Sequence, residues 1–160
     1  VPLRGELTAP VSVRSFSFRD GSFIQAVVKT MEKLLQPSDT ELEASISHAI
    51  LPVLMCSAAA QGDVQSVESV LKQPQRAGHG VSINSADYEG RTPLQLACMK
   101  GHLDMVKYLL LNSAEVNLLD RNRQTALDHA AAGGFQVVAD LLKEHGAKRG
   151  SELYNENEDK

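Results

Sequence analysis

The sequence predicts an all-α fold, a solenoid of helix-turn-helix repeats with hairpin tips, preceded by a short helical cap. Residues 87–117 are followed by a second copy of themselves at a fixed offset of 33 residues, with Asp87 recurring as Asp120 and Gly101 as Gly134. Each copy contains two short apolar patterns of helical spacing, separated by a glycine. A period of this length indicates stacked units that bury their apolar faces against one another.

The copy at 87–117 predicts a tip followed by two helices. Its first residues, Asp87-Tyr88-Glu89-Gly90, are typical of a hairpin tip, because glycine adopts the left-handed backbone that such turns need. Thr92 is placed to cap the first helix, and Pro93 lies in its first turn, where a missing N–H costs nothing. A glycine then ends this helix. The second helix is expected to bury one apolar face, made of Leu103, Val106, Leu109 and Leu110.

A degenerate copy at residues 51–84 precedes the two regular repeats at 87–117 and 120–148. Its Gly62 matches Gly101, but lies 39 residues before it rather than 33. The extra residues fall in the polar Pro/Gly stretch QPQRAGHG, which is typical of a loop. The sequence therefore predicts a modified first repeat, and a repeat region that ends at residue 148.

The repeated pattern D-x-x-G-x-T-P-L-x-x-A-x-x-x-G-H-x-x-x-V-x-x-L-L resembles the ankyrin repeat. This resemblance implies a stack of helix pairs that recognises other proteins through its tips and the concave face of its first helices. Gln95 and Asp128 replace the histidine of the family's T-P-L-H, and both can still bond neighbouring backbone. Arg123 and Ser113 stand where the family has glycine. Since a left-handed backbone there would cost on the order of 1 kcal/mol, both sites are expected to relax locally.

Helical spacing also occurs before the repeats. Residues 23–35 predict one amphipathic helix, which Pro37 ends. The apolar residues along its face are Phe23, Val27, Met31 and Leu34. The tetrad Ser38-Asp39-Thr40-Glu41 has the spacing of a capping box and is expected to open a second helix. The residues that this second helix carries inward are Leu42, Ile46, Ala49 and Ile50.

These helices predict the domain organisation. Residues 1–15 are expected to be a linker from the tail of an upstream domain, and residues 16–50 a helical cap over the open end of the first repeat. The alternative is a hinge to another domain, and both interpretations can hold. Residues 149–160 are rich in acidic side chains and are expected to form a disordered tail.

Composition restricts the class of partner. The net charge of −4 and the aromatic content of 4% supply neither the basic field nor the stacking residues that nucleic acids require. No apolar run approaches the roughly 18 residues of a membrane span, and no signal peptide is visible. Because the chain starts at Val1 rather than at Met, we expect a piece of a longer protein. We expect that protein to be cytoplasmic.

No motif in the sequence predicts catalysis, a metal or a cofactor. Cys56 and Cys98 lack a C-x-x-C spacing and are expected to be buried thiols in a reducing compartment. Asp128 and His129 are adjacent, so their side chains point apart on a helix and do not form a metal pair. No serine-hydrolase elbow, P-loop or dinucleotide-binding glycine loop is present in the sequence.

A second resemblance lies outside the repeats. Leu3–Thr8, with the sequence LRGELT, resembles a segment near the end of the catalytic region of cytosolic (type I) L-asparaginases. In animal members, also named lysophospholipase, a short helical stretch and an ankyrin region follow, and its first repeat is similar to residues 50–64 here. The resemblance implies the noncatalytic end of an enzyme that hydrolyses asparagine to aspartate and ammonia. The family's catalytic threonines lie upstream, so none of them maps onto this sequence.

Two other interpretations remain open. One is a free-standing ankyrin adaptor. The other is the C-terminal ankyrin region of a glutaminase, whose repeats share the D-Y-x-x-R-T look of Asp87–Thr92, although the LRGELT motif favours an asparaginase. The residues encoded before Val1 discriminate the three. A T-G-G-T threonine motif indicates the asparaginase, an S-x-x-K motif the glutaminase, and a nearby initiator Met the adaptor.

The resemblance to ankyrin repeats also places a partner surface on the tips and the adjoining helix. Its expected ligand is a protein partner or the chain's own catalytic region, with oligomerisation possible through the parent enzyme. Tyrosine and arginine are enriched among interface hot spots; the alternative is an ordinary solvated surface. The residues of this surface, called the tip surface below, are Tyr88, Glu89, Arg91, Met99, Lys100, Arg121, Asn122 and Gln124.

The predicted cap can be tested by truncation. Removing residues 1–36 should expose apolar surface on the first repeat, so the melting temperature should fall or the protein should aggregate. If Phe23 and Met31 are buried there, replacing either with Ala should cost roughly 2–5 kcal/mol. Thermal unfolding followed by circular dichroism checks this expectation. An unchanged melting temperature in the truncated chain would assign these helices to a neighbouring domain.

Overall fold

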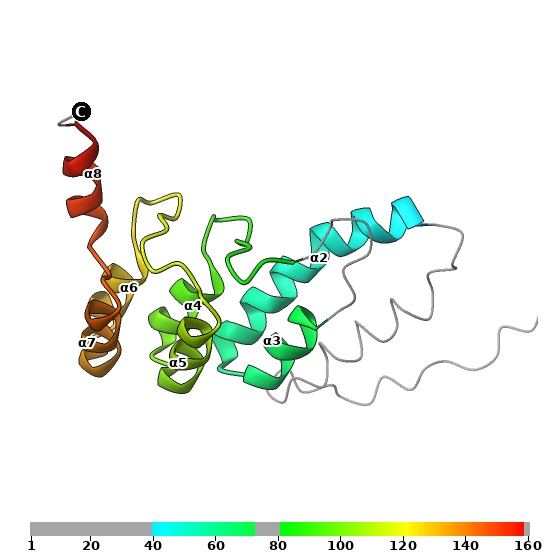
Figure 1. Cartoon of the computed structure of the whole chain (residues 1–160), viewed down its shortest axis with the longest axis horizontal. Helices are drawn as coiled ribbons and strands as arrows, with labels where there is room; N and C mark the ends of the chain where they lie inside the picture. The colour runs from blue at the N-terminus through cyan, green and yellow to red at the C-terminus, as the bar shows by residue number, and fades with distance from the viewer. Residues whose placement is uncertain (1–39, 73–80, 159–160) are drawn as a thin grey trace, which may run out of the picture.

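In the computed structural model, residues 40–72 and 81–158 are described, and these residues form seven helices and no strand. The predicted linker, most of the cap and the loop at 73–80 lie outside them. Helices α2 to α7 form a row of three pairs, and the loops that precede α4 and α6 project from one side of the row (Figure 1). No described helix is long and apolar enough to cross a bilayer. The helices are α2 Thr40–Gln61, α3 Val64–Leu71, α4 Pro93–Lys100, α5 Leu103–Leu111, α6 Ala126–Ala132, α7 Gln136–Glu144 and α8 Gly150–Glu158.

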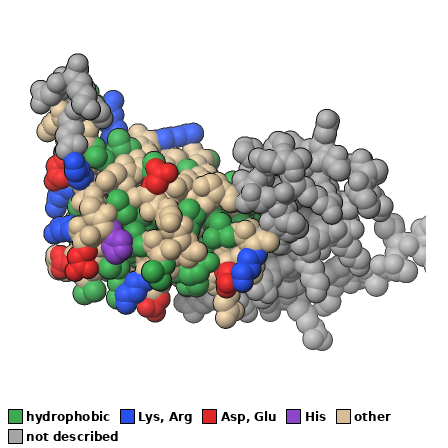
Figure 2. Space-filling model, in the orientation of Figure 1, with side chains coloured by type: hydrophobic (Ala, Val, Ile, Leu, Met, Phe, Trp, Pro, Cys, Tyr) green, Lys and Arg blue, Asp and Glu red, His purple; other side chains and the backbone are tan. Residues whose placement is uncertain are grey.

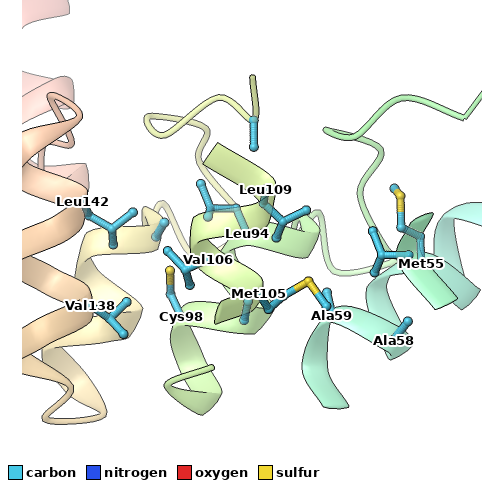
Figure 3. Close-up of a cluster of buried hydrophobic side chains, with 14 of the residues drawn as sticks. Met55, Ala58, Ala59, Leu94, Cys98, Met105, Val106, Leu109, Val138 and Leu142 are labelled. Atoms are coloured by element: carbon cyan, nitrogen blue, oxygen red, sulfur yellow. The ribbon is translucent and has the colours of Figure 1, made fainter. Parts of the chain in front are cut away.

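The prediction of an all-α stack of helix pairs is confirmed. The first helices α2, α4 and α6 pack side by side in one layer, and the second helices α3, α5 and α7 contact one another in a second layer. Buried apolar side chains fill the space within and between the pairs (Figure 3). The largest of them, each at most 1% exposed, are Met55, Leu94, Met105, Leu109 and Leu142. This shared burial holds neighbouring repeats together.

The predicted threonines cap the first helices of both regular repeats. Oγ1 of Thr92 accepts the backbone N–H of Gln95 at 3.3 Å, and Oε1 of Gln95 accepts that of Thr92 at 2.8 Å. Thr125 and Asp128 make the same exchange at 3.4 and 3.0 Å. These bonds satisfy N–H groups that have no partner within the helix. The expectation that Gln95 and Asp128 act as structural substitutes is therefore confirmed.

The predicted boundary between cap and repeats, at residue 50, lies inside α2, which runs through it without interruption. Leu51 and Met55 are buried, whereas Ala49 and Ile50, which the sequence analysis placed inward, are exposed. The buried face of α2 is the one that packs against α3 and α4. Packing against α3 and α4 buries Leu51 and Met55, whereas Ile50 lies on the face of α2 that is exposed.

Ser113 and Arg123 adopt the left-handed backbone, contrary to the expected local relaxation. Their φ angles are 64° and 60°, close to the 77° and 75° of the glycines at the equivalent positions of the other repeats. Hydrogen bonds across each turn explain the difference. After Ser113, the N–H of Ala114 reaches the carbonyl of Leu109 at 3.0 Å, and the N–H of Arg123 donates to the carbonyl of Asp120 at 3.0 Å. These bonds offset a local strain on the order of 1 kcal/mol.

Residues 150–158 form a helix rather than the disordered tail that their acidic composition suggested. α8 is anchored at its start, where the N–H of Gly150 donates to Oδ2 of Asp128 at 2.8 Å. A Cβ on Gly150 would lie 2.0 Å from the carbonyl oxygen of Arg123, so only glycine fits there. Further along, the Arg123 guanidinium lies 4.8 Å from the centre of the Tyr154 ring. Contacts with the last repeat therefore order this segment.

Gly101 and Gly134 are a matched pair for mutation, because they occupy equivalent positions with φ angles of 71° and 73°. A Cβ on Gly134 would meet no atom within 4 Å, whereas one on Gly101 would lie 2.4 Å from the Phe135 ring. Gly134→Ala should lower the free energy of unfolding by about 1 kcal/mol through backbone strain alone. Gly101→Ala should cost a further ~1–3 kcal/mol through steric overlap. Urea denaturation measures the free energy of unfolding of both variants. Equal losses in the two would show that the Phe135 ring moves aside without cost.

Candidate partner-binding surface

Two hairpin tips form the projecting edge of the stack, and an aspartate closes each of them. Oδ1 of Asp87 accepts the backbone N–H groups of Glu89 and Arg91, both at 2.9 Å. In the same way, Oδ1 of Asp120 accepts the N–H groups two and four positions later, at 2.8 and 2.9 Å. A carboxylate that bonds the backbone following it stabilises a turn. The same local hydrogen bonds therefore define both tips.

The second carboxylate oxygen is used differently at the two tips. Oδ2 of Asp87 accepts from Nε and Nη2 of Arg91 at 3.0 and 2.8 Å, and Nη1 of Arg91 also pairs with Glu89 at 2.6 Å. Oδ2 of Asp120 instead lies 2.9 Å from Nε2 of His129 on α6, and both of these side chains are buried. The first tip is thus closed by its own arginine, whereas the second is anchored to the helix that follows it.

Hydrogen bonds between repeats hold the two tips side by side. The N–H of Arg121 donates to the carbonyl of Glu89 at 3.2 Å. The side-chain amide of Gln95 donates to the carbonyls of Leu118 and Gln124 at 2.8 and 3.0 Å. Gln95 is only 1% exposed, so these bonds form away from competing water. The tips are therefore one connected surface rather than two independent loops.

A pair of asparagines forms a second connection between repeats. Oδ1 of Asn84 accepts the N–H of Glu115 at 3.0 Å, and Oδ1 of Asn117 accepts the N–H of Lys148 at 2.8 Å. Each asparagine thus links its loop to the following repeat. The sequence analysis assigned neither residue a role, although their spacing of one full period was the signal that could have identified them.

The structure places the predicted tip surface on two adjacent tips and the end of α4. Arg91 also has a structural role, because its ion pairs with Asp87 and Glu89 stabilise the first tip. Arg123 and Leu119, which the prediction omitted, are exposed on the second tip. The exposed predicted residues are Tyr88, Lys100, Arg121, Asn122 and Gln124, and the half-buried ones are Glu89, Arg91 and Met99.

Side chains that could serve chemistry have structural roles here. Cys56 and Cys98 are free, buried thiols, as predicted. Burial raises the pKa of each thiol to about 12, so neither is a thiolate near neutral pH. The hydroxyl of Thr125 donates to the carbonyl of Lys148 at 2.8 Å. Within the described ranges, no three His, Cys, Asp or Glu side chains come together as a metal site would require.

Comparisons with known proteins relate the chain to repeat proteins. A family model described as ankyrin repeats (3 copies) matches residues 54–152. An L-asparaginase from Dirofilaria immitis is 30% identical over 145 residues, which is 91% of this chain and 22% of the asparaginase. The serine/threonine-protein kinase VIK from Arabidopsis thaliana is 38% identical over 88 residues, which is 55% of this chain and 19% of the kinase. The chain therefore spans about a fifth of the length of these two relatives.

A solved structure shares the arrangement of the helices. It is a chain from the complex of a predatory endopeptidase of Bdellovibrio bacteriovorus with an immunity protein, and it matches with a TM-score of 0.53 and 33% sequence identity. The match covers 59% of this chain and 47% of that chain. The likeness therefore extends from the repeated sequence to the stacking of the repeats.

Mutation should change the free energy of unfolding at tip-surface residues that form ion pairs within the chain, and leave it nearly unchanged at fully exposed ones. Arg91→Ala should lower the free energy of unfolding by about 1–3 kcal/mol, because it leaves the Asp87 carboxylate, only 6% exposed, without its cation. Tyr88→Ala should change it by less than about 0.5 kcal/mol, since Tyr88 is 70% exposed. Urea denaturation of both variants checks this. A clear loss in Tyr88→Ala would mean that the ring is packed and would remove it from the binding surface.

Proposed function

The chain belongs to the ankyrin-repeat family, and from this premise we propose that it is the noncatalytic interaction module of an asparagine amidohydrolase. Ankyrin-repeat stacks are protein–protein interaction modules that present tips and first helices to a partner. The proposed role is to bind the enzyme's own catalytic region or a separate protein, and so to direct assembly or regulation.

One observation supports the asparaginase context above the others. The alignment with the Dirofilaria immitis L-asparaginase is 145 residues long, more than the ankyrin family match over 54–152 can supply. It must therefore include most of the sequence before the repeats. The kinase alignment is only 88 residues long, a length that the repeats alone can supply. Shared repeats alone explain the alignment with the kinase. The alignment with the asparaginase also requires similarity in the sequence before the repeats.

The geometry of the tips supports protein binding as the role of the module. The tips are joined by hydrogen bonds, so a partner meets a surface that is already ordered and loses little free energy in ordering it. Tyr88, Arg121 and Asn122 are exposed on this surface. Two buried free thiols, Cys56 and Cys98, suit a reducing compartment and support the proposal of a cytoplasmic protein.

An activity assay tests the proposal. The purified 160-residue chain should release no ammonia from asparagine or glutamine, and no fatty acid from a lysophospholipid, above the blank, because its thiols and its capping threonines are buried away from any substrate. The product of the complete reading frame should hydrolyse asparagine. Turnover by the 160-residue chain that survives repurification would contradict the noncatalytic role.

The same assay separates the alternatives. A complete product that prefers glutamine and carries an upstream S-x-x-K motif would indicate a glutaminase. A reading frame that begins shortly before Val1 would indicate a free-standing adaptor. For an asparaginase, the upstream region expressed separately should bind this chain in calorimetric titration, or the two should bind a third protein together. Tyr88→Ala is the variant of choice for weakening that binding, since it leaves the fold intact.

A further inference from the structure

We propose that the tip surface binds an acidic segment of a partner protein, with a partner carboxylate held by Arg121 and an apolar side chain packed on Tyr88. This inference rests on the proposed protein-binding function and names the chemistry of the ligand. It follows from two observations: the carboxylates of the tips are paired within the chain, whereas two cations of the tip surface are not.

Every carboxylate of the two tips already has a partner within the chain. Asp87 is bound by Arg91, and Glu89 pairs with the same guanidinium. Asp120 is buried against His129. The two aspartates are therefore not available to bind a basic ligand, and the charge of the half-exposed Glu89 is already balanced by Arg91. The charges on the tip surface that remain unbalanced are cationic.

Two exposed cations on the same surface have no such partner. Arg121 on the second tip and Lys100 at the end of α4 form no ion pair and no side-chain hydrogen bond with the described residues. Arg123 differs from them, because its guanidinium already lies over Tyr154 of α8. Arg121 and Lys100 are therefore the cations that a ligand can reach without breaking a contact.

Arg121 is also held in place. Its N–H donates to the carbonyl of Glu89 at 3.2 Å, which ties its backbone to the first tip. A Cβ on Gly90 would meet Cγ of Arg121 at 3.4 Å, so the stem of the arginine lies across the glycine of the neighbouring tip. Tyr88, 70% exposed, is on that same tip. An exposed aromatic ring and an unpaired guanidinium thus belong to two tips that are directly bonded to each other.

The exposed acidic groups of the protein lie mostly elsewhere. Glu68 on α3, Asp104 on α5, and Asp140 and Glu144 on α7 lie on the second helices of the pairs. Glu152 on α8 is exposed, and its carboxylate accepts the N–H of Arg149. In Figure 2, Lys and Arg atoms lie at the upper edge of the described part, where Figure 1 places the tips, and patches of both charges lie below that edge. The overall charge of −4 therefore does not describe the tip surface.

An acidic protein segment fits this surface better than a nucleic acid does. A phosphate backbone is bound by many cations at once, and its affinity grows with their number. The tips offer two unpaired cations and one exposed ring, while the rest of the chain carries a net negative charge that repels a polyanion. One or two carboxylates beside an apolar side chain match the number of groups available.

Selection from a displayed library of random peptides on the immobilised 160-residue chain tests the inference. The selected peptides should be enriched in Asp and Glu, and their binding should weaken as salt is raised. Arg121→Glu should weaken a selected peptide by roughly tenfold, and Arg121→Gln by roughly threefold, as expected for removing or reversing one exposed charge contact. Lys107→Glu makes the same change of charge on the exposed face of α5 and should leave binding within about twofold.

The outcomes separate this inference from the function on which it rests. Neutral or basic peptides that bind equally well to Arg121→Glu would overturn the acidic ligand and leave protein binding intact. Equal losses in Arg121→Glu and Lys107→Glu would also overturn it, because the effect would then be one of overall charge. Competition by a thymidine oligonucleotide would identify a polyanion site instead. No selected peptide, and no binding of the upstream region, would contradict both proposals. Circular dichroism of each variant confirms that it is folded.

Discussion

Three alanines occupy the same position in the three first helices, and the stack depends on how closely they let those helices approach. Ala58, Ala97 and Ala130 are completely buried, and each lies on a helix that packs against its neighbour in the row. A larger side chain at any of them would push the helices apart, because protein interiors have no spare volume. That separation would also break the bonds that cross between repeats, such as those from Gln95 to the next tip. The positions of the tips therefore follow from the spacing of the helices.

The tip surface can take part in binding because the residues that stabilise a repeat occupy fixed positions and leave other tip residues without a structural role. Each regular repeat needs an aspartate to close its tip and a threonine to start its helix. The residues between these positions, Tyr88 on one tip and Arg121 on the next, satisfy no backbone group with their side chains. They are free to serve recognition for that reason. Arg91 is an exception, because this half-buried tip residue balances the charge of the Asp87 carboxylate.

Under the proposed function, this module acts on amide hydrolysis through binding. Its buried thiols have pKa values raised by burial, and Thr125 uses its hydroxyl to hold the carbonyl of Lys148. Catalytic sites require such groups to be exposed and activated. A connected stack is instead suited to hold a catalytic region in an assembly, or to bring a partner to it. α8 extends this connection, since it is fixed to the last repeat through Gly150 and Tyr154.

The sequence by itself determined the period, the helix caps and part of the buried face of α5. Val106 and Leu109 are buried as predicted, whereas Leu103 and Leu110 are only half-buried and the buried Met105 was missed. A threonine followed by a proline, or leucines at helical spacing, act within one turn or one helix, so the local sequence contains all the information that these features need. Only the tertiary structure decided which face of α2 is buried and that a helix begins at Gly150, because the deciding partners lie on other helices or in another repeat. At Ser113 and Arg123 the left-handed backbone is accompanied by hydrogen bonds across the same turn, which the residue types did not indicate. A hydrogen bond or packing contact of this kind outweighs a local preference on the order of 1 kcal/mol.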